Sequence, residues 1–472
     1  MLFTQPSFLF LFLPLLLAIY FALPSRGMSR NVLLLAASTL FYATGAGSFT
    51  WLILGLIAFN YAAARAVDQR RDGRAGRWIL RAAIAADLTV LAIFKYADFT
   101  VRNVNTLWAA LGRSVFPLPH VLLPIGISFF TFHAISYVVD VYRRDATAQK
   151  RPIEAGLYLL LFPQLIAGPI IRYREIADQL QTRVVVPTGF AAGVKRFVVG
   201  LAKKVLVANV VAVPADAIFG MPTAELTAAH AWLGAICYTL QIYFDFSGYS
   251  DMAIGLGAMF GFRFPENFNY PYIATSVQDF WRRWHMSLSR WFRDYVYVPL
   301  GGNRVSAGRT YVNLIAVFFL CGLWHGASWT FVAWGLYHGV FLVIERLRRR
   351  NAASAPSGVA HVYTLLVVTV GWVFFRAETF GQAAGFLRAM AGLGLGRPTA
   401  FDPSYYLDPR TVAALAVGLI GATPRPAGIA RRLTALAPVP GLLEPAAVAL
   451  LFAISVMFIA ASSYNPFIYF RF

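Results

Sequence analysis

One histidine stands in the middle of a long apolar run, in the stretch CGLWHGASW at residues 321–329. This residue, His325, is flanked by Gly322 and Gly326, which let backbone or a ligand approach closely. The unperturbed pKa of histidine is about 6.5, and burial lowers it, so a buried imidazole stays neutral. His325 is therefore predicted to act as a general base that takes the proton of an attacking hydroxyl group.

The surroundings of His325 offer two aromatic walls, Trp324 and Trp329, and one hydrogen-bonding side chain, Ser328. Three other histidines, His133, His285 and His338, also lie inside apolar segments, where ionisable groups are expensive and are functional candidates. His338 follows His325 by thirteen residues, which places the two on different faces of a continuous helix. They are not expected to share a site unless the helix breaks.

His285 lies in the stretch SVQDFWRRWHMSLSRWFRDYVY, residues 276–297, which is predicted to form one amphipathic helix at the membrane interface. Ser276 and Asp279 resemble an N-cap with its partner. The aromatic stripe of this helix is expected to pack and anchor it, and His285, at the edge of the stripe, should face protein. Its arginines suit either anionic lipid or an anionic substrate such as a phosphorylated donor.

The elements that position these residues belong to a membrane protein. Of the 472 residues, 58% are hydrophobic and only 13% are charged, whereas soluble proteins average about 25% charged residues. We expect an all-α, polytopic protein with about eleven to thirteen membrane helices, including re-entrant and interfacial ones around a central tunnel. A single domain is expected, with N-terminal spans in residues 1–119, a catalytic core in 120–345 and C-terminal spans in 346–472.

The net charge of +20 arises from basic clusters in short loops between apolar segments, which is the positive-inside pattern rather than a nucleic-acid surface. The clusters lie at residues 65–81, 143–151, 346–350 and 425–432, and we place them in the cytoplasm. The loop at 98–120 is poor in lysine and arginine and should face the other side. The predicted location is the bacterial inner membrane, crossed several times.

Several alternative chemistries lack their motifs. The sequence has no G-x-S-x-G elbow and no phosphate-binding loop, and no two histidines have the i, i+4 spacing of a zinc helix. Cys237 and Cys321 both lie in apolar segments and predict neither a disulfide nor a metal cluster. No metal and no bound cofactor are expected.

A second unusual stretch is LYLLLFPQLIAGPIIRYREI at residues 157–176. Pro163, Gly168 and Pro169 prevent a continuous helix there. A broken segment at membrane depth is tolerated only where protein or a water-filled cavity covers the freed backbone groups, so we expect it to be re-entrant and central.

Taken together, four stretches make the chain resemble the membrane-bound O-acyltransferase family, and most of all its bacterial branch that acetylates extracellular polysaccharide such as alginate. They are FPQLIAGPIIRYREI (162–176), QIYFDFSGYSDMAIGLGAMFGFRFPENFNYPY (241–272), DFWRRWHMSLSRWFRDYVYVPLGGNR (279–304) and GLWHGASWTFVAWGLYHG (322–339). The closing YNPFIYFRF fits the same branch.

The resemblance implies transfer of an acyl group, most readily acetyl from acetyl-CoA, from the cytoplasm toward a hydroxyl outside. It implies that His325 is the family's near-invariant histidine and His285 its second important position, orienting or polarising the thioester. Weaker candidates for donor or substrate contacts are Asp245, Asp251, Arg283, Trp324 and Ser328. The implied partner is a periplasmic or membrane-anchored acetyltransferase that completes delivery to the sugar.

Two kinds of alternative stay open. The acceptor could be peptidoglycan, another envelope polymer or a lipid, or the transferred group could be D-alanine on teichoic acid. A transporter that exports glycan or lipid without chemistry would also place ionisable residues in the membrane. The sequence has no sign of the inverted repeats common in transporters, which argues against that alternative.

Overall fold

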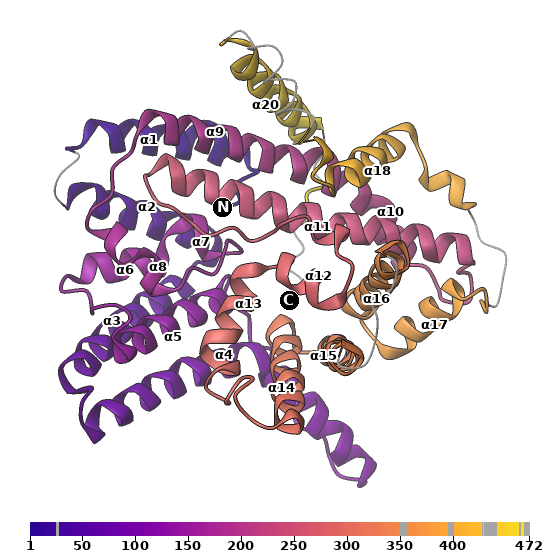
Figure 1. Cartoon of the computed structure of the whole chain (residues 1–472), viewed down its shortest axis with the longest axis horizontal. Coiled ribbons are helices and arrows are strands. Elements are labelled where there is room, and N and C mark those ends of the chain that lie inside the picture. Colours follow the sequence, from indigo (N-terminus) through magenta and orange to yellow (C-terminus); the bar gives the residue numbers. More distant parts are fainter. Residues whose placement is uncertain are drawn as a thin grey trace. The chain divides into compact units, whose positions relative to one another are not determined.

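The computed structural model describes residues 1–24, 28–349, 357–394, 401–426, 428, 441–461 and 464–466. Helices connected by turns and loops make up these residues, and no strand occurs among them, which confirms the predicted all-α class (Figure 1). The chain forms two compact units, Met1–Phe197 with Met252–Pro265, and Val198–Asp251 with Glu266–Phe472. That they form a single catalytic domain stays a prediction.

The first unit is built on three mutually packed helices, α3, α4 and α5, against which shorter helices lie (Figure 1). Its elements are η1 (Phe8–Phe12), α1 (Leu13–Ala22), α2 (Ser29–Ala46), α3 (Phe49–Arg70), α4 (Arg74–Ala110), α5 (Ile127–Arg143), α6 (Pro152–Leu160), α7 (Phe162–Leu165), α8 (Tyr173–Ile176), η2 (Asp178–Leu180) and most of α9 (Pro187–Ala202).

The stretch at 157–176 is broken, as predicted. Helix α6 ends at Leu160, α7 spans only one turn, and non-helical chain leads to α8. Protein groups satisfy the freed backbone: Phe162 N–H donates to Ser38 Oγ at 3.1 Å, and Ile171 N–H donates to His133 Nε2 at 3.3 Å. These contacts confirm that protein covers this segment.

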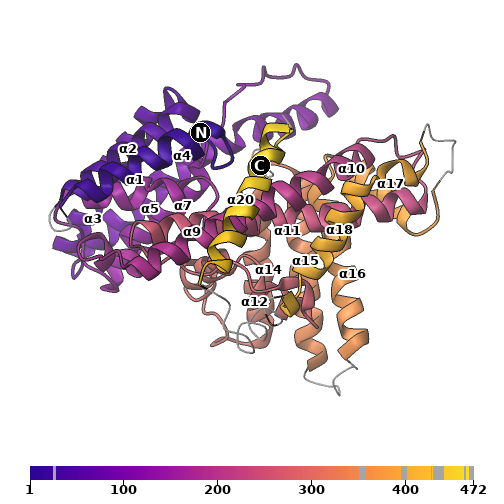
Figure 2. The same ribbon diagram turned by 90° about the horizontal axis from the view of Figure 1, so that it is seen from above.

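The second unit holds the helices that carry His285 and His325. Its elements are η3 (Lys203–Ala208), α10 (Asn209–Phe219), most of α11 (Ala228–Met259), η4 (Pro271–Ile273), α12 (Val277–Arg283), α13 (Met286–Phe292), η5 (Arg293–Tyr297), α14 (Ala307–His325), α15 (Trp329–Arg349), α16 (Ser357–Arg376), α17 (Phe380–Met390), η6 (Pro403–Tyr406), α18 (Pro409–Gly421) and α20 (Leu443–Ala461). Helices α15 and α16 lie side by side (Figure 2).

Helices α14 and α15 form a hairpin that depends on glycine. A Cβ atom at Gly335 would lie 3.1 Å from the carbonyl carbon of Phe318, and one at Gly322 would lie 3.2 Å from that of Phe331. Neither position has room for a side chain, so the two helices pack backbone to backbone. This close packing places the end of α14, which is His325, against α15.

Five helical stretches in the described part of the chain are long and apolar enough to cross a membrane. They are Phe49–Arg70, Pro187–Phe219, Ala307–His325, Ser357–Arg376 and Leu443–Ala461. Shorter apolar helices occur at Phe8–Ala22 and Pro409–Gly421. These helices support a membrane protein, whereas the number of eleven to thirteen spans and the central tunnel stay predictions.

Candidate active site

His325 is the last residue of α14, and it is almost fully buried. Gly326 follows in an extended conformation, and the chain turns back into α15 within three residues. The flanking glycines make room for Phe331, whose backbone lies on Gly322 and whose ring lies on Gly326. From the sequence, these glycines could admit either backbone or a ligand. The structure supports close approach of the protein chain.

Aromatic rings enclose the His325 imidazole. The ring centroids of Trp324, Trp334 and Phe375 lie 4.8, 5.0 and 5.2 Å from its own, and all three meet it edge to face. Trp324 is buried, so it forms the wall predicted for it. Trp329 is 51% exposed and is not among these three rings.

Ser328, predicted as a substrate contact, bonds within its own turn. Its Oγ atom lies 3.0 Å from Thr330 Oγ1 and accepts the Thr330 N–H at 3.3 Å. These bonds satisfy a backbone donor in the first turn of α15, which is the usual work of a serine before a helix.

His285 lies at a break in the predicted amphipathic helix. Helix α12 ends at Arg283 and α13 begins at Met286, so the expectation of one continuous helix over 276–297 is wrong. The His285 backbone adopts φ 42° and ψ 54°, in the left-handed region that residues other than glycine rarely enter. The predicted N-cap is confirmed, since Ser276 Oγ accepts the Asp279 N–H at 3.0 Å.

Asn267 explains the break. Its backbone carbonyl accepts the N–H of Met286 at 2.9 Å, and its side-chain Oδ1 accepts the Ser287 hydroxyl at 2.9 Å. The same Oδ1 atom lies 3.0 Å from His285 Nδ1. These bonds replace those that a continuous helix would have made, so the backbone groups at the break are not left unsatisfied.

The His285 ring is buried against two aromatic side chains. Phe246 meets it edge to face with centroids 4.6 Å apart, and Trp324 lies 6.3 Å away on another side. Burial lowers the pKa of His285 to about 3, so the ring is neutral. The two histidines predicted to be catalytic therefore both contact Trp324, and the structure brings them into one aromatic cluster.

A third histidine joins this cluster. His338 is fully buried, and its ring lies 5.4 Å from that of Trp334, which also contacts His325. His325 and His338 were expected to share a site only if the helix between them breaks. The chain does break there, between α14 and α15. Trp281, from α12, lies 5.2 Å from His338 on another side.

Three of the weaker candidates form ion pairs within the protein. Asp245 bonds Lys204 Nζ at 2.8 Å in a buried pair, and Asp251 bonds Lys203 Nζ at 2.6 Å. These pairs join α11 to η3, where a Cβ atom at Gly248 would lie 2.8 Å from the Gly200 carbonyl oxygen. These contacts give both carboxylates a structural role in packing the helices.

The third is Arg283, whose Nε atom donates to Asp279 Oδ2 at 2.9 Å, one turn earlier in α12. Its NH1 group donates to the carbonyl of Asn269 at 3.3 Å. Its neighbour Arg282 is exposed and makes no ion pair with any described residue.

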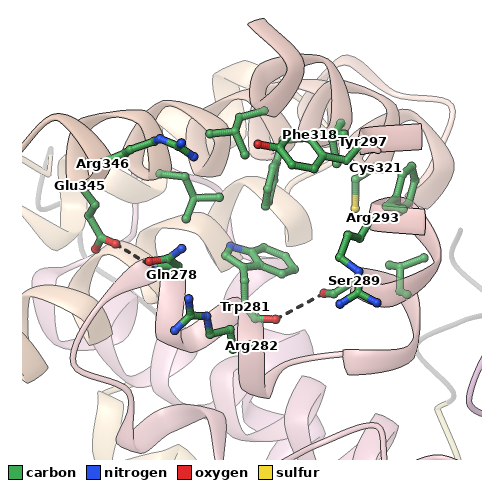
Figure 3. Close-up of a pocket in the computed structure, with 15 residues that line it drawn as sticks. Gln278, Trp281, Arg282, Ser289, Arg293, Tyr297, Phe318, Cys321, Glu345 and Arg346 are labelled. Atoms are coloured by element: carbon green, nitrogen blue, oxygen red, sulfur yellow. Dashed lines mark hydrogen bonds between the residues drawn. The ribbon is translucent and has the colours of Figure 1, made fainter. Parts of the chain in front are cut away.

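A pocket of about 460 Å³ opens beside the cluster, between α12, α13 and the α14–α15 hairpin (Figure 3). Its inner wall includes Trp281, Phe318 and Cys321. Cys321 precedes His325 by four residues, so it lies one helical turn away on the same face of α14. The pocket therefore lies within about one helical turn of His325, which is not itself among the lining residues.

Charged side chains gather at the rim of this pocket. Arg346 and Glu345 lie on one side and Arg293 on the other, with Trp281 between them (Figure 3). Arg293 bonds the neighbouring Asp294 at 2.7 Å, and Arg346 bonds an asparagine amide, whereas Arg282 is free to meet a ligand. The three arginines and one glutamate give the lining an excess of positive charge, which suits an anionic group.

Glu345 has a separate task. Its two carboxylate oxygens accept the backbone N–H groups of Val277 at 2.6 Å and Gln278 at 3.0 Å. A carboxylate is favoured at the N-terminus of a helix, where unpaired N–H groups meet the positive end of the helix dipole. Glu345 therefore holds the start of α12 to α15.

Neither Asn267 nor Arg282 stands out in the sequence as a site residue. Asn267 lies in the quoted stretch at 241–272, but nothing local distinguishes it from the other asparagine there, since its partners are 18 and 20 residues away. Arg282 and Arg283 look equivalent in sequence, and only the ion pair with Asp279 separates them. Among the described residues, no three His, Cys, Asp or Glu side chains are grouped to hold a metal ion.

Comparison with known proteins connects this geometry to a reaction. The model of the membrane-bound O-acyltransferase family, MBOAT, matches residues 88–375. The chain is 43% identical to the probable alginate O-acetylase AlgI of Azotobacter vinelandii, with all of both chains covered. It is also similar to the peptidoglycan O-acetyltransferase of Helicobacter pylori, at 38% identity over 83% of this chain and 80% of the other.

A more distant relative is the teichoic acid D-alanyltransferase of Bacillus subtilis, at 32% identity over 56% of this chain and 71% of the other. All three relatives are named for acyl transfer to polymers of the cell envelope. The family predicted from the four sequence stretches is thus confirmed: this chain belongs to the membrane-bound O-acyltransferase family and is an O-acyltransferase.

Proposed function

We propose that this O-acyltransferase takes acetyl groups from acetyl-CoA in the cytoplasm and transfers them for O-acetylation of a secreted polysaccharide such as alginate. One observation carries the proposal: His285 and His325 contact the same tryptophan beside a pocket rimmed with arginines. Full-length similarity to a probable alginate O-acetylase supports the acceptor class.

The charge of the pocket suits the donor. Coenzyme A carries phosphates at one end and an uncharged arm that ends in the thioester at the other. Arg282, exposed and without an ion pair in the described structure, would meet the phosphates. The arm would follow Phe318 and Cys321 inward, which directs the thioester toward His325.

The chemistry needs two neutral imidazoles. One ring takes the proton of the acceptor hydroxyl as its oxygen forms a bond to the thioester carbonyl carbon. The other donates a hydrogen bond to the carbonyl oxygen, on which negative charge develops. The carbon–sulfur bond then breaks, and the thiolate of coenzyme A takes the proton from the imidazolium. Sequence reasoning gives the role of base to His325.

Delivery outside the cell needs a second protein. We expect the chain to lie in the bacterial inner membrane with its basic loops in the cytoplasm, and to work with a periplasmic or membrane-anchored acetyltransferase. The segment at 98–120 is poor in lysine and arginine, and in the structure α4 continues to Ala110, so only its second part is a loop; we expect this segment to face that partner.

Peptidoglycan is the second candidate acceptor. Similarity to the Helicobacter pylori peptidoglycan O-acetyltransferase over most of both chains favours it. The reaction at the histidines would be the same, and only the acceptor and the partner would differ.

One experiment tests the function and separates the acceptors. Ester-linked acetate is measured on secreted polysaccharide and on purified cell wall from a deletion strain that carries either the wild-type gene or His325→Ala, at equal protein levels in the membrane. We expect acetate to be lost from the polysaccharide fraction in the variant. Loss from the cell wall alone would support the second candidate, and unchanged acetate in both fractions would contradict catalysis by His325.

A further inference from the structure

The orientation of the Asn267 amide is fixed by its neighbours. Its Oδ1 atom lies 3.3 Å from the backbone nitrogen of Ser287, which can only donate a hydrogen bond. This atom must therefore be the oxygen and not the nitrogen of the amide. The nitrogen, Nδ2, points the other way and donates to Ser250 Oγ at 3.0 Å.

This orientation decides the tautomer of His285. Because Asn267 Oδ1 can only accept, the His285 Nδ1 atom 3.0 Å away must carry a hydrogen and donate it. A neutral imidazole has one N–H group, so the lone pair lies on Nε2. Nε2 is buried and has no hydrogen-bond partner among the described residues.

The backbone holds the ring in this orientation. His285 has φ 42°, in the left-handed region that a residue with a side chain rarely adopts. Hydrogen bonds on both sides hold it: Met286 N–H donates to the Asn267 carbonyl, and Asn269 N–H donates to the Arg283 carbonyl, each at 2.9 Å. Backbone and side chain of Asn267 thus act on the same turn.

An open lone pair in an aromatic enclosure is suited to accept a proton. A neutral ring with hydrogen on Nδ1 has no N–H at Nε2 and cannot donate from there to a thioester oxygen. This tautomer favours a role for His285 other than the orienting or polarising one expected from the sequence. The pocket lining includes Cys321, four residues before His325, and Leu288 and Ser289, three and four residues after His285, so the pocket lies beside both rings.

We propose that Asn267 is a positioning residue that holds His285 with hydrogen on Nδ1, and that His285 Nε2 takes the proton of the acceptor hydroxyl. This inference rests on the proposed function. The hydroxyl oxygen bonds to the thioester carbon, its proton moves to Nε2, and the departing thiolate takes that proton from the imidazolium. His325 then hydrogen-bonds to the thioester oxygen.

The first test replaces the neutral acceptor with a charged one. Asn267→Asp keeps an oxygen beside Nδ1–H but adds a negative charge, which stabilises the imidazolium. We expect transfer to continue, with the acidic limb of the pH–rate profile moved upward by about one to three pH units. The rings beside His285 belong to Phe246 and Trp324, which do not titrate, and its hydrogen-bond partner in the wild type is the uncharged amide of Asn267.

A limb that does not move in Asn267→Asp would overturn the proposal, because His285 would then not be the base. The second variant, Asn267→Leu, removes the acceptor, and we expect kcat to fall at least tenfold with less change in KM. Asn313→Leu is the matched control, since Asn313 is equally buried but donates only to the Leu300 carbonyl. Equal kcat in the two leucine variants would also contradict the proposal.

A spectroscopic readout makes the inference independent of turnover. Nitrogen NMR of histidine-labelled protein in bilayers, with His285→Gln to identify the signal, should give a protonated Nδ1 and an unprotonated Nε2. The opposite pattern would overturn the assignment. If the wild type transferred no acetyl group at all, the proposed function would fail while this measurement still tested the role of Asn267.

Discussion

His133 and His285, one in each unit, use opposite nitrogens of the same ring. His133 Nε2 accepts the backbone N–H of Ile171, so its lone pair serves the fold and its hydrogen lies on Nδ1. His285 donates its hydrogen to Asn267, so its lone pair is left free of the fold. Both rings are buried, and burial alone does not distinguish them.

The difference shows that the chemistry of a buried histidine depends on which nitrogen the fold employs. In the first unit the imidazole closes a broken segment, because a peptide N–H at Ile171 would otherwise be unsatisfied. In the second unit the Asn267 side chain accepts the ring N–H of His285, which leaves the basic nitrogen available. Only the second arrangement leaves the basic ring nitrogen able to accept a proton.

Removing the free lone pair gives the largest expected effect. His285→Leu should lower acetyl transfer by about 10²–10⁴-fold, the usual contribution of general acid–base catalysis. Turnover is measured per folded molecule with labelled acetyl-CoA. If His285→Leu lost only stability while its remaining folded molecules kept full turnover, the distinction between His133 and His285 would be wrong.

A buried ion pair should affect stability rather than turnover. Lys204→Met removes the cation of the buried pair with Asp245, which should lower the free energy of unfolding by about 3–5 kcal/mol. Thermal unfolding in detergent measures the effect. The double variant with Asp245→Leu should recover most of it, since no charge is then left buried.

If the double variant were stable but failed to bind donor, Asp245 would belong to substrate binding, as the sequence suggested. Lys204 also donates to the carbonyl of Pro466, so part of the loss belongs to that contact. A Lys203→Met variant offers the matched comparison, because its pair with Asp251 is more exposed and should contribute less.

His133→Leu is the counterpart of His285→Leu in the first unit. It removes the acceptor of the Ile171 N–H, which should destabilise the protein by about 1–3 kcal/mol. Turnover per folded molecule should stay near that of the wild type. Loss of turnover without a change in the melting temperature would show that His133 has chemistry that its hydrogen bond does not reveal.

The smallest expected effect separates two neighbouring arginines. Arg282→Gln should raise the KM for acetyl-CoA severalfold, because an exposed charge contact contributes about 0.2–1 kcal/mol. Arg283→Gln breaks a pair with Asp279 instead, and should affect KM less. A larger rise in KM for Arg283→Gln would support Arg283, the candidate from the sequence, as the arginine that contacts the donor.

Much of this was predictable from the sequence, and the exceptions have a common cause. The helical class, the family and the broken stretch at 157–176 follow from composition and from long motifs. His285 and His325, two of the three histidines in the cluster, are also candidates from the sequence. Local pattern cannot predict contacts between distant residues, so the ion pairs of Asp245 and Asp251 with lysines 41 and 48 positions away were missed.

The break at His285 is the clearest such case. Residues 276–297 have a continuous aromatic stripe that favours one helix, yet Asn267 offers other hydrogen bonds to the same backbone. Tertiary bonds therefore overrode local helix preference. The same bonds determine the tautomer of His285, which composition and spacing cannot reveal.

The two bonds from Glu345 to α12 have a kinetic consequence. Helix α12 has seven residues, begins at the Glu345 carboxylate on the pocket rim, and ends two residues before His285. A donor that displaces Glu345 would therefore act on the helix that leads into His285. Binding of the donor should therefore be linked to binding of the acceptor. The KM for each substrate should change when the concentration of the other is varied.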